Sequence, residues 1–229
     1  MTMKNNKQTP LKDTDILEPL KDSNNQPNEL SGILIEGHIK IFDPDSGEVF
    51  VNKRNAIHYE NFSEALALGV GDKTTGYIHE MHFGSGGTSV DSTGVITYLP
   101  PNNSGANADL YNKTYYKVVD DNSSRNLDPI RNKIEIRHIA GKVYTDILVT
   151  CLLDYGEPAT GQSAFDNATD LNSDFVFDEL GLKSWTGTEG EGKLLTHVIF
   201  HPVQKSLNRL IQVEYTVRIQ TLTNLSSTG

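Results

Sequence analysis

Two pairs of histidines are the first candidates for chemistry, because imidazole is a common protein ligand of metal ions. His79 and His82 are three residues apart, and His197 and His201 are four residues apart. Either spacing would bring both rings to one face of a helix. The neighbouring residues predict strands instead, on which the first pair points to opposite faces and the second lies about 13 Å apart. We therefore expect no metal site at either pair.

An acidic stretch and a glycine-rich stretch suggest other kinds of ion binding. Asp170, Asn172 and Asp174 have the spacing that opens a calcium-binding loop. Phe175 and Gly181 stand where such a loop requires its glycine and its last glutamate, so we expect a solvated loop, with a looser calcium site as the alternative. Residues 84–87 are Gly-Ser-Gly-Gly, but neither Lys-Ser/Thr nor a helix follows. They predict a tight bend rather than a phosphate-binding loop.

Nucleophiles and paired acids give no catalytic set. Cys151 is the only cysteine, so no intrachain disulfide forms, and its apolar neighbours predict a buried, inert thiol. Two pairs of adjacent carboxylates are Asp120-Asp121 and Asp178-Glu179. Neighbours on a strand point in opposite directions, so we expect solvated faces rather than an acid and base pair. We predict no catalytic, cofactor-binding or metal-binding residues.

The elements that must position these residues are mainly strands. The isoleucines between positions 33 and 41 share one parity, residues 43–47 form a Pro- and Gly-containing turn, and residues 48–51 return, which predicts a hairpin. A second hairpin is predicted for residues 133–139 and 143–153, and its second strand should be buried on both faces. Further strands are predicted at residues 77–83, 111–119, 194–200 and 210–222, with a short strand at most at 175–177.

One helix and three long loops complete the chain. Asn61, with Glu64 three residues later, predicts a capping box at the start of a short helix that ends near residues 69–71. Residues 89–108, 120–129 and 156–173 are polar and rich in turn-forming residues, which predicts loops. Loops of this length usually carry contacts.

Composition disfavours several classes of function. The chain has 229 residues and a formal charge of −10, and a net acidic surface disfavours direct binding of nucleic acid. No apolar run approaches the ~18 residues of a membrane-spanning helix, so no membrane partner is expected. The first residues contain no apolar stretch typical of a secretory signal, which predicts cytoplasmic synthesis and a soluble destination.

These patterns together predict a mainly β fold. We expect an antiparallel β-sandwich or jelly-roll-like domain over residues 31–229, with one short helix and long loops. Its opening hairpin, helix and strand occupy residues 31–90, and its sandwich strands occupy residues 110–222. Residues 1–30 form an extended N-terminal arm, polar and without periodicity. Alone in water the arm should be disordered, and a neighbouring subunit is expected to order it.

Two segments of the opening region also resemble a known class of protein. They read GHIKIFDPDSGEVFVNKRNAI at residues 37–57 and IHEMHFGSGGTS at residues 78–89. Together they resemble virion structural proteins of tailed bacteriophages, of the neck, tail and fibre-attachment type in large contractile-tailed phages. In those proteins a hairpin, an Asn-Ala/Ile junction, an alanine-rich helix and an F-G-x-G-G-T bend commonly occur in series. Residues 194–219 resemble their last hairpin, less specifically.

The resemblance implies a non-enzymatic building block of the virion, without a cofactor. Such a block forms a homo-oligomer, typically a ring, and contacts other virion proteins of the neck, tail or baseplate. The resemblance assigns no functional residues. We expect the arm and the long loops to join the subunits, after synthesis in the host cytoplasm. The alternative is a capsid-surface or receptor-binding module that stacks Trp185 and Tyr98 on glycans.

Overall fold

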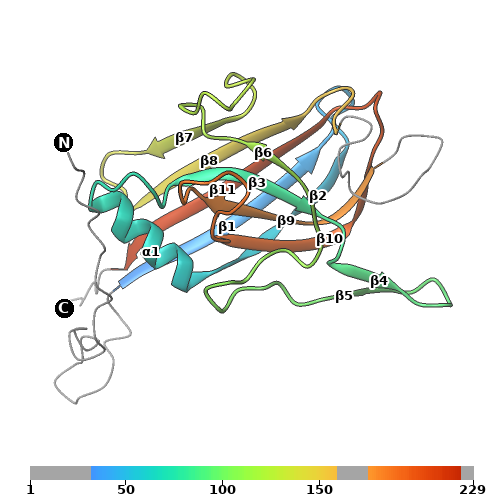
Figure 1. The fold of residues 1–229 in the computed structure, drawn as a ribbon, viewed down its shortest axis with the longest axis horizontal. Helices are drawn as coiled ribbons and strands as arrows, with labels where there is room; N and C mark the ends of the chain where they lie inside the picture. The colour runs from blue at the N-terminus through green and yellow to red at the C-terminus, as the bar shows by residue number, and fades with distance from the viewer. Residues whose placement is uncertain (1–31, 159–174, 223–229) are drawn as a thin grey trace, which may run out of the picture. The chain divides into compact units, whose positions relative to one another are not determined.

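The computed structural model describes residues 32–158 and 175–222, in which Leu34–Gln220 form one compact unit. Nine strands form a single antiparallel sheet in the order β6-β3-β9-β10-β2-β1-β11-β8-β7, and two more form the separate hairpin β4-β5. The large sheet is curled like half of a barrel (Figure 1). The elements are β1 (Gly32–Phe42), β2 (Val49–Ile57), α1 (Tyr59–Val70), β3 (Ile78–Gly84), β4 (Thr88–Val90), β5 (Ile96–Tyr98), β6 (Lys113–Val118), β7 (Lys133–His138), β8 (Tyr144–Leu153), β9 (Phe175–Ser184), β10 (Thr196–Lys205) and β11 (Ile211–Leu222).

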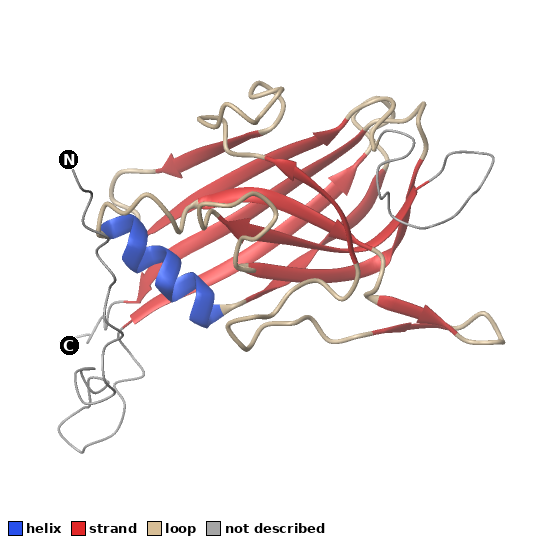
Figure 2. Cartoon of the chain, in the orientation of Figure 1, coloured by secondary structure: helices blue, strands red, loops and turns tan. Residues whose placement is uncertain are grey.

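The prediction of a mainly β, antiparallel and sandwich-like domain with one short helix and long loops is confirmed (Figure 2). One continuous curled sheet supplies the opposing faces, where the sequence alone suggested two sheets. The predicted N-terminal arm, residues 1–30, lies outside the described residues, as do residues 170–174 of the acidic loop. Both interpretations therefore stay predictions.

Both predicted hairpins form. β1 pairs with β2, and the turn between them is closed by Asp43, whose carboxylate accepts the N–H groups of Asp45 and Ser46 at 2.9 and 3.2 Å. Ile39 and Ile41 are fully buried, whereas Ile33 is 57% exposed, because the apolar parity extends beyond the packed part of the strand. In the second hairpin only the later half of β8 is buried on both faces, so that prediction holds in part.

The length of β9 was not predictable from hydrophobicity. The sequence predicts at most a short strand at residues 175–177, but β9 has ten residues and lies between β3 and β10. Asp178, Glu179 and Lys183 interrupt its apolar pattern, yet all three are buried. Hydrogen bonds and ion pairs to other segments satisfy them, and these pairings are invisible in the local sequence.

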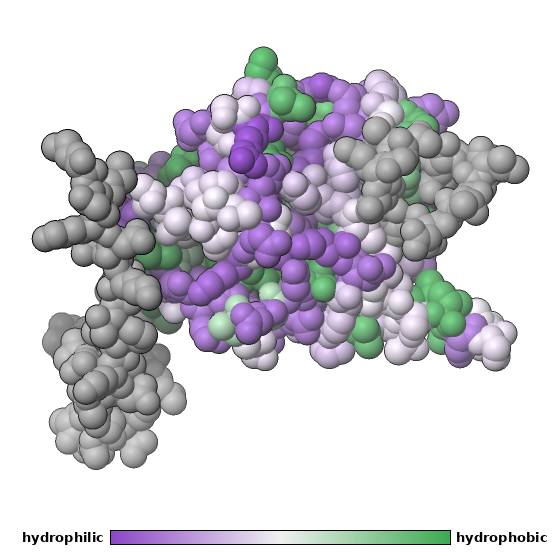
Figure 3. All heavy atoms as spheres, viewed as in Figure 1, coloured by the Kyte–Doolittle hydropathy of each residue, from purple (hydrophilic) through white to green (hydrophobic). Residues whose placement is uncertain are grey.

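Residues 89–108, expected as a polar loop, contain most of the β4-β5 hairpin. Asp91 organises its turn, because one carboxylate oxygen accepts the N–H groups of Thr93 at 2.7 Å and Val95 at 3.0 Å. The hairpin carries exposed apolar residues, Val90 and Val95 among them, and it forms a green patch on a largely purple surface (Figure 3). Polar composition here reflects the turn rather than the absence of strands.

The helix starts earlier than its predicted cap. His58 is the N-cap of α1, and its Nδ1 accepts the N–H of Asn61 at 3.3 Å. Asn61 lies inside the helix, buried, and donates from its side chain to the carbonyl of Leu194 at 2.9 Å. Glu64 forms an ion pair with Lys193 instead of closing a capping box. The predicted end is confirmed, since α1 stops at Val70 before Gly71.

Candidate functional site: an apolar groove beside the helix

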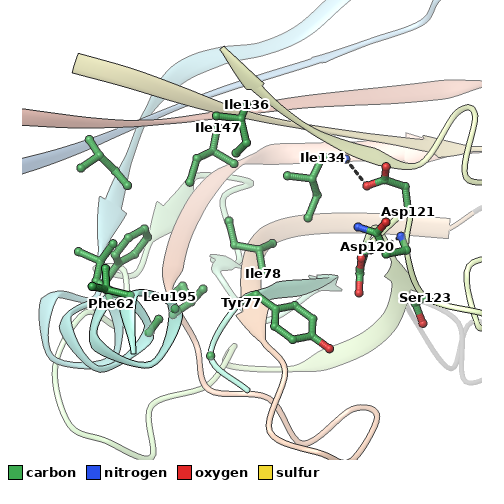
Figure 4. Close-up of a pocket in the computed structure, with 17 residues that line it drawn as sticks. Phe62, Tyr77, Ile78, Asp120, Asp121, Ser123, Ile134, Ile136, Ile147 and Leu195 are labelled. Atoms are coloured by element: carbon green, nitrogen blue, oxygen red, sulfur yellow. Dashed lines mark hydrogen bonds between the residues drawn. The ribbon is translucent and has the colours of Figure 1, made fainter. Parts of the chain in front are cut away.

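An open groove of about 730 Å³ lies between α1 and the strands β7, β8 and β11. Isoleucines of the sheet project into it from one side, and Phe62, Ile78 and Leu195 project into it from the other (Figure 4). We call this surface the helix–sheet groove. Its lining comprises Phe62, Ala65, Leu66, Gly69, Val70, Gly76, Tyr77, Ile78, Asp120, Asp121, Asn122, Ser123, Ile134, Ile136, Ile147, Leu195 and Ile219.

The groove exists because the apolar face of the sheet extends further than the core that covers it. Ile136 of β7 pairs with Ile147 of β8, which pairs with Val217 of β11, so the three form one row across the strands. Val217 is fully buried, Ile147 is half-buried and Ile136 is 66% exposed. The row therefore runs from the core to an uncovered edge without changing its apolar character. Isolated exposed residues are common, but a continuous apolar row makes this surface a candidate binding site.

One end of the groove is acidic. Asp121 is exposed, as predicted, and its carboxylate accepts the N–H of Ile134 at 3.2 Å (Figure 4). Asp120 is buried, contrary to the prediction, and lies 3.2 Å from His79 Nδ1. Burial and the charge of Asp120 together raise the pKa of Tyr77. No Lys or Arg is among the described residues that line the groove.

The histidines of β3 are part of the fold. His79 contacts Asp120, whereas His82 donates from Nε2 to Glu80 at 2.7 Å and stacks on Tyr116. Burial lowers the pKa of His82 below its ordinary value of 6.5, so the ring is neutral at pH 7. Burial opposes ionisation of Glu80, but hydrogen bonds from His82 and from a backbone N–H hold its pKa below the ordinary 4.5. No group of three His, Cys, Asp or Glu side chains in the described ranges is arranged to hold a metal ion.

Stability should therefore fall in two steps as the pH is lowered. His82 and Glu80 both have lower pKa values folded than unfolded, so the unfolded chain binds more protons and stability rises with pH. The contribution of His82 is lost as the pH falls below 6.5, and that of Glu80 below 4.5. Urea midpoints measured across this range check the expectation. His82→Gln keeps a donor toward Glu80 and should flatten the upper step; an unchanged upper step would rule out His82 as its source.

The glycine-rich bend binds protein carboxylates. Glu179 accepts the N–H groups of Gly86, Tyr111 and Asn112 at 3.0, 2.9 and 2.8 Å. Its neighbour Asp178 accepts the N–H groups of Gly87 and Thr88, so the backbone donors of the bend point into the fold. The tight bend is confirmed, whereas the prediction that this acidic pair is solvated is wrong.

The second histidine pair is separated, as the strand prediction requires. His197 is fully buried, donates from Nε2 to Glu179 at 3.0 Å and accepts the N–H of Asn102 at Nδ1. His201 is exposed and lies 3.3 Å from the hydroxyl of Tyr98. Burial opposes ionisation of Glu179, but hydrogen bonds from His197 and from backbone N–H groups hold its pKa below the ordinary value. With both ring nitrogens engaged inside the fold, His197 has a structural role.

The remaining candidates also have partners in the fold. Cys151 is fully buried, as predicted, and burial raises the pKa of its thiol to about 12. The ring of Trp185 is half-buried and packs 4.4 Å from the ring of His79, measured between centroids. Tyr98 is 49% exposed. Of the two aromatic residues proposed for glycan stacking, Tyr98 is the more exposed.

A second hollow, lined by β6 and the loops before β7 and after β8, differs from the groove in its charge. Lys117 forms an ion pair with Glu157 at 2.6 Å, and Arg131 forms one with Asp154 at 2.5 Å. Its charges are thus largely neutralised by one another, and they favour neither an anion nor a cation. The helix–sheet groove is the stronger candidate binding site, because its lining is mainly apolar and the described residues in it form no such ion pairs with one another.

Comparison with protein-family models, with curated proteins and with solved structures finds no match to this chain. In the described part of the chain, α1 is too short to cross a bilayer. The fold and the site together define a β domain built on one curled antiparallel sheet, with an apolar groove at one edge.

Sequence patterns identified the strands that line the groove but not the groove itself. The alternation of residues 133–139 shows that Ile134 and Ile136 share a face. Nothing in that alternation shows that Val217 of the same row is fully buried while Ile136 stays exposed. The available signal was the alternation itself, which places Ile134 and Ile136 on the face opposite Lys133, Glu135 and Arg137.

Proposed function

We propose that this protein is a non-enzymatic structural component of a tailed-phage virion, one that joins further copies of itself and other virion proteins. The observation that carries the proposal is the helix–sheet groove, an apolar surface left open beside a well-packed core. Burying such a surface against a second copy removes apolar area from water, which drives association. In the neck, tail or baseplate, the protein acts by binding neighbouring subunits.

The state of the polar residues supports this role. The residues best suited to acid–base chemistry, His82, Glu179 and His197, are each at most 2% exposed and hydrogen-bonded within the fold. A catalytic group must reach its substrate within hydrogen-bond distance. These groups face other parts of the chain instead, so they stabilise the scaffold.

The elements behind the resemblance follow one another as a compact series. Residues 37–57 lie in the β1-β2 hairpin, α1 follows, and residues 78–89 comprise β3, the glycine bend and the start of β4. The bend is fixed by Asp178 and Glu179 of β9. This series of hairpin, helix, strand and bend supports the virion proposal at the level of local architecture.

The edges of the sheet favour the groove over open-ended strand pairing as the contact. β7 ends the described sheet, and its outward parity carries Lys133, Glu135 and Arg137. Glu135 pairs with both neighbours at 3.2 Å. Charged side chains along an edge strand discourage another strand from adding to it. The apolar side chains on the other face of the same strand, Ile134 and Ile136, face the groove.

A lysine in the groove should weaken assembly. Ile136→Lys places a charge in the proposed interface and removes a contact of about 1.5–3 kcal/mol, so the dissociation constant should rise roughly tenfold or more. Ile130→Lys is the matched control, because Ile130 is 81% exposed and does not line the groove. Sedimentation velocity of the full chains compares the two variants with the parent. Assembly weakened equally by both substitutions, or a parent that stays monomeric at every concentration, would count against the proposal.

A further inference from the structure

We infer that the helix–sheet groove of one copy binds residues 16–20 of the N-terminal arm of a second copy. The inference rests on the proposed function, since it names the partner that the groove takes in assembly. Residues 16–20 are Ile-Leu-Glu-Pro-Leu, the densest apolar cluster in the first 31 residues, which are otherwise mostly polar. An apolar segment in a polar arm matches an apolar surface on the folded domain.

The groove has the form that a short apolar segment requires. Its volume of about 730 Å³ falls in the range of ordinary binding clefts. Its walls come from different elements: Ile136 and Ile147 from the sheet, and Phe62 and Leu66 from the helix. An extended chain can lie between a helix and a neighbouring strip of sheet and contact both, which is how peptides commonly occupy grooves.

The sequence of the segment favours an extended backbone. Pro19 restricts Glu18 to extended conformations and removes one N–H that would otherwise need a partner. In a polyproline-type helix, with three residues per turn, Leu17 and Leu20 share one face. That face can meet the apolar lining while Glu18 remains in solvent. Lys21 follows directly and can lie near the exposed Asp121, where a surface ion pair sets direction more than affinity.

The length of the connection allows the segment to reach a neighbour. Residues 21–31 join the segment to Gly32, where β1 begins. Eleven extended residues span at most about 40 Å, more than the width of a small domain. β1 begins at the end of the sheet where β11 finishes, and Ile219 near the end of β11 lines the groove (Figure 1). Each copy thus has a donor segment and an acceptor groove, and head-to-tail binding of this kind generates a ring where the rotation between copies closes and a filament where it does not.

Mixing two defective full-length chains tests the inference. The groove variant, Ile136→Lys, keeps an intact arm; the arm variant, Leu17→Ser with Leu20→Ser, keeps an intact groove. Each alone should associate at least tenfold more weakly than the parent. An equimolar mixture should form heterodimers and stop there, because only one arm–groove contact remains possible. Sedimentation velocity with one variant labelled measures this, and Ile130→Lys mixed with the arm variant is the control that retains grooves on both chains.

The outcomes separate this inference from the proposed function. A parent that assembles while the arm variant assembles equally well would overturn the inference alone, because another segment or surface would then occupy the groove. Two defective chains that remain monomeric after mixing would also overturn it. That result is expected if each arm binds the groove of its own chain instead of a neighbour's. A parent that never assembles would contradict both the inference and the proposed function. Far-ultraviolet circular dichroism establishes that each variant is folded before it is scored.

Discussion

A chain that begins at residue 31 should fold and remain monomeric under conditions in which the full chain assembles. The core of the described unit lies within Leu34–Gln220, so removing the arm deletes no core residue. The donor segment is lost, and the contact it would make is repeated in every subunit of a closed assembly. Because repeated contacts reinforce one another, the concentration that the truncated chain needs for assembly should rise on the order of a hundredfold. Light scattering coupled to size-exclusion chromatography measures the shift.

Removal of residues 1–10 alone is the matched control for this deletion. It shortens the arm but leaves residues 16–20 and their connection to β1 intact. We expect this shorter deletion to assemble as the full chain does. Assembly that persists unchanged after removal of residues 1–30 would contradict the role of the arm, and a loss of folding would contradict the independence of the core.

Replacing Glu179 should produce the largest loss of stability. Its carboxylate is fully buried and accepts three backbone N–H groups and His197 Nε2. Glu179→Ala leaves these buried donors without an acceptor, at a cost on the order of 3–5 kcal/mol. That is a large fraction of the 5–15 kcal/mol typical of a whole domain. Urea unfolding followed by the fluorescence of Trp185, the sole tryptophan, measures the change.

Glu135→Ala is the control, because Glu135 lies on the edge strand in partly exposed ion pairs. Surface pairs of this kind contribute about 0–1 kcal/mol, so the variant should unfold close to the parent. If Glu179→Ala proves too unstable to purify, Glu179→Gln retains one acceptor oxygen and should show an intermediate loss. Equal midpoints for the Glu179 and Glu135 variants would mean that the carboxylate does not organise the glycine bend.

The strands were largely predictable because their alternation is a local property. β11 is the clearest example, since its buried residues, Val213, Tyr215 and Val217 among them, keep a strict period of two. β9 was not predictable, because the burial of Asp178 and Glu179 depends on N–H groups from residues 86–88, 111 and 112. Local periodicity carries no information about donors about seventy to ninety residues away in the chain.

The same limit applies to the helix and the groove. Asn61 looked like a cap because its type and spacing fit one, but the side chain of His58, buried by packing, took that position. Ile136 shares a face of β7 with Ile134, yet it is 66% exposed, whereas Val217 in the same cross-strand row is fully buried. In both places tertiary packing, rather than local pattern, decides which residues are covered.

What occupies the helix–sheet groove in an assembled particle is the most direct test of the arm–groove contact. Cryo-electron microscopy of the assembled full chain shows which residues contact Ile136 and Phe62. We expect density for an extended segment of a neighbouring copy in the groove, with side chains that fit Leu17 and Leu20. A groove that faces solvent in every subunit of a well-resolved assembly would contradict it.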